Sequence, residues 1–166
     1  MRVSSVALAA ALTIVCLSTS LTAQRPDDQI DARSLQLLAQ GKAARAAGNF
    51  DGATDLLETA VAVDPRNRAA FVVLGEVATA RGLPGKAIRL YREALLLEPN
   101  DVVALGGQGQ AMVAKGAVTR ARDNLTKIKT LCKGACPEAT QLAAAIAKGP
   151  PITTAQVEVK PAVSKE

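Results

Sequence analysis

A spacing of 34 residues, which recurs in three rows beginning at Ser34, Arg68 and Val102, constrains this sequence most strongly. In each row, glycine, alanine and large apolar residues return at fixed positions. The matching sets are Gly41, Gly75 and Gly109; Gly48, Gly82 and Gly116; Ala53, Ala87 and Ala121; Leu57, Tyr91 and Leu125; and Leu37, Phe71 and Leu105. A unit of this length cannot bury its apolar face alone, so such units stack to form one continuous core.

Each row has the pattern of two antiparallel helices. Small residues at Gly41 and Ala53 allow the two helices to approach closely, and Gly48 can end the first helix in a left-handed conformation. Asn49 can cap the second helix, which ends before Pro65 because proline disfavours helical geometry in the preceding residue. The predicted helices are 34–47, 50–63, 68–81, 84–97, 102–115 and 118–131, followed by an amphipathic helix at 137–147.

These residues resemble the tetratricopeptide repeat. The second row matches that pattern best, with Phe71, Leu74, Gly75, Ala87, Tyr91, Ala94 and Pro99. The first row departs from it at Gln40 and Leu57, and the third at Gln108, Leu125, Ile128 and Lys133. The resemblance implies an all-α fold, an α-solenoid of three helical hairpins (34–67, 68–101 and 102–133) closed by a C-terminal capping helix at 137–147. The alternative is an unrelated helical bundle with a chance periodicity.

The start of the chain has the pattern of a secretory signal peptide over residues 1–23. A positive charge at Arg2 precedes an uncharged apolar run over 6–17, and small residues lead to a cleavage position after Ala23. The apolar run is too short to cross a bilayer, and the alternatives are an uncleaved anchor or acylation at Cys16. We therefore expect an exported protein, located in a bacterial periplasm, with no transmembrane span in the mature chain.

Two further segments flank the repeat domain, which we place at residues 34–148. Residues 24–33 are a polar lead-in, although the first helix can start earlier, near Asp28. Residues 149–166 contain three prolines and no helical periodicity, which predicts a flexible tail.

The composition excludes several kinds of chemistry. Histidine is absent, so the chain has no Ser-His-Asp triad, no Cys-His pair and no histidine-ligated zinc or haem. Its aromatic residues are Phe50, Phe71 and Tyr91 alone, too few for a protein that binds nucleic acid by base stacking. Together with this composition, the resemblance to the repeat family implies a non-enzymatic binding module, for which we expect no cofactor or metal.

The resemblance implies a concave groove lined by the first helix of each hairpin, where a partner peptide binds. The corresponding positions are Leu35, Leu38, Lys42 and Arg45; Ala69, Val72, Val73, Glu76 and Thr79; and Val103, Gly106, Gln110 and Val113. Some family members hold a terminal carboxylate with a fixed set of Lys, Asn and Arg, but Val72, Val73, Gly106 and Gly107 stand there in this chain. We expect an apolar or acidic peptide segment; alternatively, these aliphatic side chains contact the lead-in or the tail.

Cys132 and Cys136 lie between the last hairpin and the capping helix. In an exported chain two cysteines at this spacing favour a disulfide that pins the cap. The alternative is a redox-active dithiol, since Cys136 precedes a helix N-terminus, where a thiolate is stabilised. The C-x-x-C spacing of thiol oxidoreductases is absent.

The third row is strongly basic, with six cations against Asp123 alone; the chain as a whole has a net charge of +5. The cations are Lys115, Arg120, Arg122, Lys127, Lys129 and Lys133. Such a run is usually a solvated helix face. The alternative is a patch, formed by Arg120, Arg122, Lys127, Lys129 and Lys133, for an anionic envelope polymer or lipid headgroups.

Overall fold

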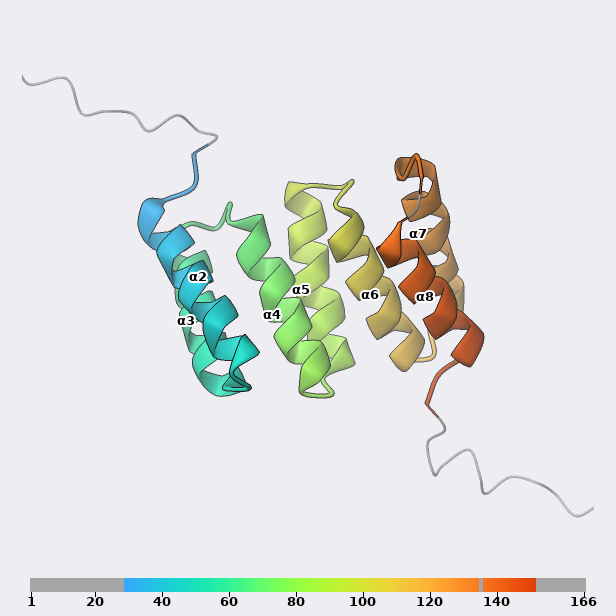
Figure 1. The fold of residues 1–166 in the computed structure, drawn as a ribbon, viewed down its shortest axis with the longest axis horizontal. Helices are drawn as coiled ribbons and strands as arrows, with labels where there is room; N and C mark the ends of the chain where they lie inside the picture. Colours follow the sequence, from blue (N-terminus) through green and yellow to red (C-terminus); the bar gives the residue numbers. More distant parts are fainter. Residues whose placement is uncertain (1–28, 135, 152–166) are drawn as a thin grey trace, which may run out of the picture.

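The computed structural model describes residues 29–134 and 136–151, and within them the chain forms seven α-helices and no strand. The helices are α2 (Ala32–Ala46), α3 (Phe50–Val63), α4 (Arg68–Ala80), α5 (Pro84–Leu97), α6 (Val102–Ala114), α7 (Val118–Leu131) and α8 (Pro137–Lys148). They pair as α2 with α3, α4 with α5 and α6 with α7. Figure 1 shows the result: α2, α4, α6 and α8 form one layer, and α3, α5 and α7 form a second layer behind it.

The expected helix boundaries are confirmed to within two residues. The main difference is the start of α2, which begins at Ala32 because the Asp31 side chain caps it, accepting a hydrogen bond from the Arg33 N–H at 2.7 Å. The last residues assigned to the lead-in, Ala32 and Arg33, are therefore helical. At the other end, α8 extends to Lys148 before Gly149 ends it with a φ of 76°.

The corner inside each hairpin has the same geometry in all three repeats. Gly48, Gly82 and Gly116 have φ values of 76°, 70° and 78°. At the first corner the Gly48 N–H donates to the Arg45 carbonyl and the Asn49 N–H to the Ala44 carbonyl, each at 2.9 Å. This is a Schellman motif, and it satisfies carbonyls that the end of the helix would otherwise leave unpaired. The predicted left-handed glycine is thus confirmed.

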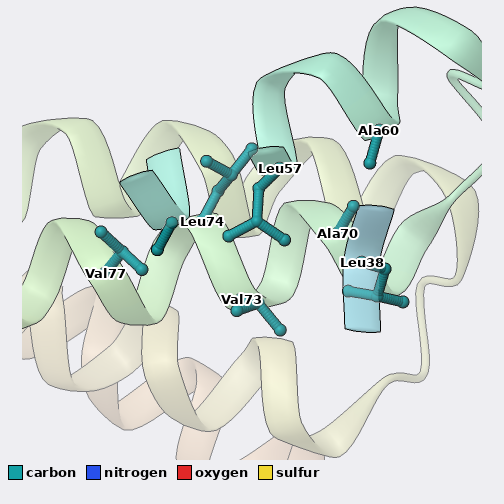
Figure 2. Close-up of a cluster of buried hydrophobic side chains, with 8 residues drawn as sticks. Leu38, Leu57, Ala60, Ala70, Val73, Leu74 and Val77 are labelled. Carbon is teal, nitrogen blue, oxygen red and sulfur yellow. The ribbon is translucent and has the colours of Figure 1, made fainter. Parts of the chain in front are cut away.

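Glycine also lets the paired helices approach within each of the first two hairpins. A Cβ atom at Gly41 would lie 2.6 Å from Leu57, and one at Gly75 would lie 2.7 Å from Tyr91. Leu57 is fully buried in a cluster formed by α2, α3 and α4 (Figure 2). In that view its side chain points toward Leu74 and Val73 of α4. The core is therefore shared between successive hairpins, as in stacked repeats.

The helix α8 closes the array by packing on both α6 and α7. It follows the register of the inner helices: Leu142 lies 34 residues after Gln108 and 68 after Leu74, and Ala143 falls in the column of Gly109. Leu142 is fully buried and packs on Gly109, where a Cβ atom would lie 2.6 Å from the leucine. The predicted capping helix is confirmed, and its sequence corresponds to the first helix of a fourth repeat, of which the described residues contain no second helix.

Several expectations lie outside the described residues. They are the signal peptide at 1–23, the lead-in from 24 to 28, and the tail from 152 to 166. Among the helices of the described part, none is long and apolar enough to cross a membrane.

Candidate binding groove

The layer formed by α2, α4, α6 and α8 carries three adjoining hollows. The first hollow, of about 380 Å³, is lined by Lys42, Arg45, Arg68, Ala69, Val72, Val73, Glu76 and Val103. The central hollow, also about 380 Å³, is lined by Arg45, Glu76, Thr79, Ala80, Tyr91, Val103, Gly106, Gly107, Gln110, Glu138 and Gln141. The third hollow, of about 640 Å³, is lined by Thr79, Gly82, Pro84, Gln110, Ala111, Val113, Ala114, Ala145, Lys148, Gly149, Pro150 and Pro151.

Adjacent hollows share their walls, so together they form one groove. Arg45, Glu76 and Val103 line both the first and the central hollow. Thr79 and Gln110 line both the central and the third hollow. The groove thus runs across all four inner helices, and its floor changes from aliphatic at α4 to glycine at α6.

Ion pairs neutralise much of the charge in the first hollow. Arg45 of α2 pairs with Glu76 of α4, and Arg68 pairs with the buried Asp101, which also caps α6. Lys42 is exposed and has no ion pair among the described residues. The first hollow therefore presents one uncompensated positive charge beside an aliphatic floor.

Tyr91 reaches the central hollow from α5 through a slot made by two glycines. Its ring lies so close to Gly75 of α4 and Gly107 of α6 that Cβ atoms there would come within 2.7 Å and 2.4 Å of it. The side chain is 3% exposed. Burial raises the pKa of Tyr91 to about 12; a hydrogen bond with Thr79 opposes this rise and the charge of Glu76 adds to it. The tyrosine is therefore a neutral, fixed part of the groove floor.

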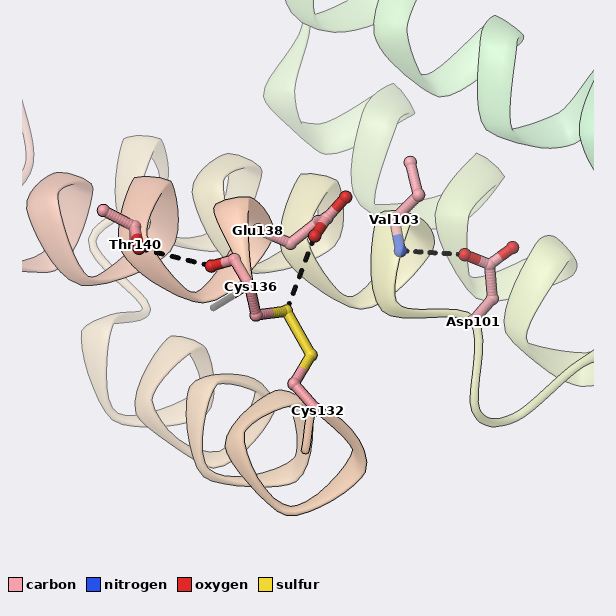
Figure 3. The surroundings of a disulfide bond; sticks show 6 residues. All are labelled: Asp101, Val103, Cys132, Cys136, Glu138 and Thr140. Carbon is pink, nitrogen blue, oxygen red and sulfur yellow. Dashed lines mark hydrogen bonds between the residues drawn. A yellow bond between two sulfur atoms is a disulfide. The ribbon is translucent and has the colours of Figure 1, made fainter. Parts of the chain in front are cut away.

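Glu138 of α8 forms the far wall of the central hollow. The helix comes close because α6 has no side chain at Gly106, where a Cβ atom would lie 3.2 Å from the Glu138 Cβ. Glu138 is half-buried, and its Oε2 lies 3.5 Å from the Cys136 Sγ (Figure 3). No lysine or arginine within 29–134 and 136–151 forms an ion pair with it.

The structure brings most of the predicted groove residues together. Those that line a hollow are Lys42, Arg45, Ala69, Val72, Val73, Glu76, Thr79, Val103, Gly106, Gln110 and Val113. Leu38 is 6% exposed and packs in the core, and Leu35 is 47% exposed but lines none of the three hollows. Val72 and Val73 are also largely buried, so their side chains form the floor of the groove and do not project into it.

The sequence reasoning missed several groove residues, among them Tyr91, Glu138 and Gln141 of the central hollow. Tyr91 belongs to the second helix of its hairpin, which was assigned to the outer layer. Glu138 and Gln141 were assigned to a cap. Continuing the 34-residue register from 102 into 136–148 places α8 in the inner layer and would have found the last two.

The cysteine pair joins the end of α7 to the start of α8. The Cα atoms of Cys132 and Cys136 lie 6.1 Å apart with their sulfurs bonded, and Cys136 is the N-cap residue of α8 (Figure 3). Its carbonyl accepts a hydrogen bond from the Thr140 hydroxyl at 3.2 Å. The pair can thus fix where α8 begins, and with it the position of Glu138.

The predicted basic residues lie on the outer layer, away from the groove. Arg120, Arg122, Lys127 and Lys129 are exposed on α7, and Lys133 is exposed just after it. Lys127 Nζ donates to the Pro99 carbonyl at 2.7 Å. Within the described residues, no group of three or more Cys, Asp and Glu side chains could hold a metal ion.

The fold belongs to a known class, the superhelical stack of helical hairpins. Residues 38–101 match a family model of the tetratricopeptide repeat, and the described part of this chain has the fold of a tetratricopeptide repeat domain. No curated protein matches the sequence significantly.

Three solved structures illustrate the similarity. The first tetratricopeptide domain of Spaghetti (RPAP3), bound to the HSP90 peptide SRMEEVD, has a TM-score of 0.66 and 20% identity over 72% of this chain and 94% of that chain. The Sgt2 domain from Aspergillus fumigatus has a TM-score of 0.66 and 21% identity over 80% and 92%. The second domain of human RPAP3, in complex with the HSP70 peptide SGPTIEEVD, has a TM-score of 0.64 and 17% identity over 68% and 94%. Identities this low show the fold alone.

Proposed function

We propose that this protein is a non-enzymatic binding module that holds a segment of a partner protein along the groove formed by α2, α4, α6 and α8. The observation that carries the proposal is the continuity of three hollows across four helices. A groove of that kind suits an extended or helical peptide, which gains affinity from many small contacts along its length. Two of the similar domains described above were solved with peptides bound.

The chemistry of the groove supports a mixed apolar and polar ligand. Val72, Val73 and Val103 provide aliphatic surface in the first hollow, while Thr79 and Gln110 provide hydrogen-bonding groups further along. The Lys42 ammonium is the uncompensated charge at the α2 end. An acidic residue of the partner segment is therefore expected at that end, next to apolar residues.

The proposal can be tested by filling the groove at Val103, which separates the first hollow from the central one and is 42% exposed. Peptides are first selected from a displayed library on the full chain, and their affinities are measured by fluorescence anisotropy. Val103→Trp should weaken binding by about 10-fold or more, because the indole takes the space of the ligand. Leu96→Trp, on the 70% exposed convex position, is the matched control.

Equal affinities for the wild type and Val103→Trp would contradict the proposal, as would a library that yields no binder. Far-ultraviolet circular dichroism of each variant checks that the fold is retained. Val72 and Val73 are unsuitable for this test, because charges placed at buried positions would unfold the protein.

We further propose that the module acts outside the cytoplasm, which rests on the signal-like pattern of residues 1–23. Expressed with a C-terminal tag in a Gram-negative host, the protein should be recovered from the periplasm with Gln24 as its first residue. Recovery of the uncleaved chain from the cytoplasm would contradict this location.

A further inference from the structure

We infer that the central hollow receives a lysine or arginine side chain of the bound segment, with Glu138 as its counter-ion. This inference rests on the proposed function, since it names the residue that a partner inserts into the groove. It differs from the expectation of an apolar or acidic ligand, because that expectation did not include α8 in the groove wall.

The shape of the hollow favours one long, slender side chain. Its floor is the Gly106–Gly107 turn of α6, where no side chain projects, and the rigid ring of Tyr91 behind it. In the preceding repeat the corresponding positions are Val72 and Val73, whose aliphatic side chains line the first hollow instead. The methylene stem of a lysine or arginine can pack on such a floor while its charged end reaches a polar wall.

The charges of the hollow favour a cation. Glu76 is already paired with Arg45, so the half-buried Glu138 carboxylate is the uncompensated charge of this hollow within the described residues. A partly buried carboxylate is less well solvated than one in water and gains more from an opposite charge. An incoming ammonium or guanidinium group would supply that charge.

The uncharged polar groups around Glu138 also suit a cationic donor. The side chains of Gln110 and Gln141 each carry a carbonyl oxygen, and Thr79 carries a hydroxyl. Lysine and arginine only donate hydrogen bonds, with three and five N–H groups respectively, so they need several acceptors at once. A carboxylate together with amide oxygens provides such a set, and charge-assisted hydrogen bonds of this kind are the strong ones.

The inference also gives the bound segment a direction. The exposed Lys42 lies at the α2 end of the groove, and Glu138 lies on α8 beyond the shared Arg45–Glu76 pair. A segment with an acidic residue beside Lys42 and a basic residue beside Glu138 matches both charges, and the reversed segment places like charges together.

The test is a double-mutant cycle between the protein and its peptide, with the oxidised full chain throughout. A capped peptide from the library selection is synthesised with its lysine or arginine and, separately, with norleucine at that position. Each peptide is titrated against the wild type, Glu138→Gln and the control Asp123→Asn, which removes an exposed carboxylate on the convex helix α7. The binding of the basic peptide should be about 10-fold weaker with Glu138→Gln, while the norleucine peptide changes by less than about 2-fold.

The cycle separates a contact from a structural role. Glu138 also lies in the first turn of α8, where an acidic residue stabilises a helix. If Glu138→Gln acts only by disturbing the structure of α8, both peptides should lose affinity equally, and that result would overturn the inference. Coupling between the charge and Glu138 should also diminish as salt is raised, because salt screens partly exposed pairs.

The outcomes distinguish this inference from the proposed function. Suppose that the selected peptides contain no lysine or arginine, bind Val103→Trp more weakly than the wild type, and bind Glu138→Gln as tightly as the wild type. That set of results would overturn the inference and leave the groove proposal standing. Binding that is insensitive to Val103→Trp would contradict the groove itself, and the inference would fail with it.

Discussion

The two ends of the repeat array differ in the interaction that holds the start of the terminal inner helix, which is a hydrogen-bond network at α2 and a disulfide at α8. At the first junction, Ser34 at the start of α2 donates to the Ala60 carbonyl at 2.7 Å and accepts from Asn67 Nδ2 at 2.8 Å, with both side chains buried. At the last junction, Cys136 at the start of α8 is bonded to Cys132. Ser34 and Cys136 occupy the same column of the 34-residue register.

Each of these two helices packs on two others, α2 on α3 and α4 and α8 on α6 and α7, but only α2 is followed by the second helix of its own repeat within the described residues. A buried polar network fixes the start of α2. The helix α8 ends the array and has no second helix of its own repeat within the described residues, so a covalent link holds its start. Terminal units of repeat proteins have one neighbouring interface fewer, and they separate first when that interface weakens.

The largest expected effect on stability is at the α2 end of the array, at Leu57. Its side chain is fully buried between α2, α3 and α4, so Leu57→Ala should lower the free energy of unfolding by about 2–5 kcal/mol. Urea denaturation followed by circular dichroism measures the loss. Leu96→Ala, at a 70% exposed position, is the control and should change it by less than about 0.5 kcal/mol. Similar losses for the two variants would contradict the assigned core.

The second prediction concerns the covalent link at the other end. Cys132→Ser combined with Cys136→Ser should lower the free energy of unfolding by about 2 kcal/mol, as the chain-entropy model gives for so short a loop. Amide hydrogen exchange should increase in α8 and remain unchanged in α2 to α5. An increase spread over all helices, or none at all, would contradict the view that the bond acts on α8 alone.

A smaller effect is expected from the polar network of the first junction. Asn67 is 2% exposed, caps α4 by accepting from the Ala70 N–H, and donates to Ser34. Asn67→Ala should therefore cost about 1–2 kcal/mol in urea denaturation. Asn49→Ala, which removes only an exposed cap from α3, should cost less than Asn67→Ala. The reverse order would show that the network contributes little.

The smallest effect is a pH dependence that belongs to the first junction. The Arg66 side chain and the Asp31 N–H hold the pKa of Asp64 at about 2, below its ordinary value of 3.8, although burial acts in the opposite direction. A carboxyl whose folded pKa is depressed stabilises the fold above its unfolded pKa, and that contribution is lost as the pH falls from 3.8 toward 2.

Asp64→Asn removes this contribution, so the stability difference from the wild type should be largest above pH 4 and should shrink between about pH 4 and 2. Thermal unfolding at several pH values measures it, with Asp123→Asn as an exposed control. A difference that stays constant down to pH 2 would contradict the proposed role of Asp64.

The sequence predicted the helices and corners well because their determinants are local and repeated. Gly48 and Asn49 act within one turn of the chain, and each recurring column adds an independent indication of the same boundary. The fold class could be predicted for the same reason. The same 34-residue register, continued past residue 133, was sufficient to place α8 among the inner helices.

Burial and side-chain contacts across the groove were less predictable. Leu38 belongs to an inner helix and yet packs in the core, because inner helices contact their neighbours on both sides as well as facing the groove. Tyr91 reaches the groove from the second layer only because Gly75 and Gly107, on two different helices, both lack a side chain. Such contacts depend on the superhelical geometry, which no single row of the repeat contains.

The most direct test of the central claim is where a selected peptide contacts the protein. Chemical-shift changes of the backbone amides are measured in the isotope-labelled full chain as the peptide is added. The account predicts large changes at Gly106, Gly107 and Gln110 of α6 and at Gln141 of α8, with small changes along α5 and α7. Changes concentrated on the convex helices α5 and α7, with the α6 glycines unaffected, would contradict it.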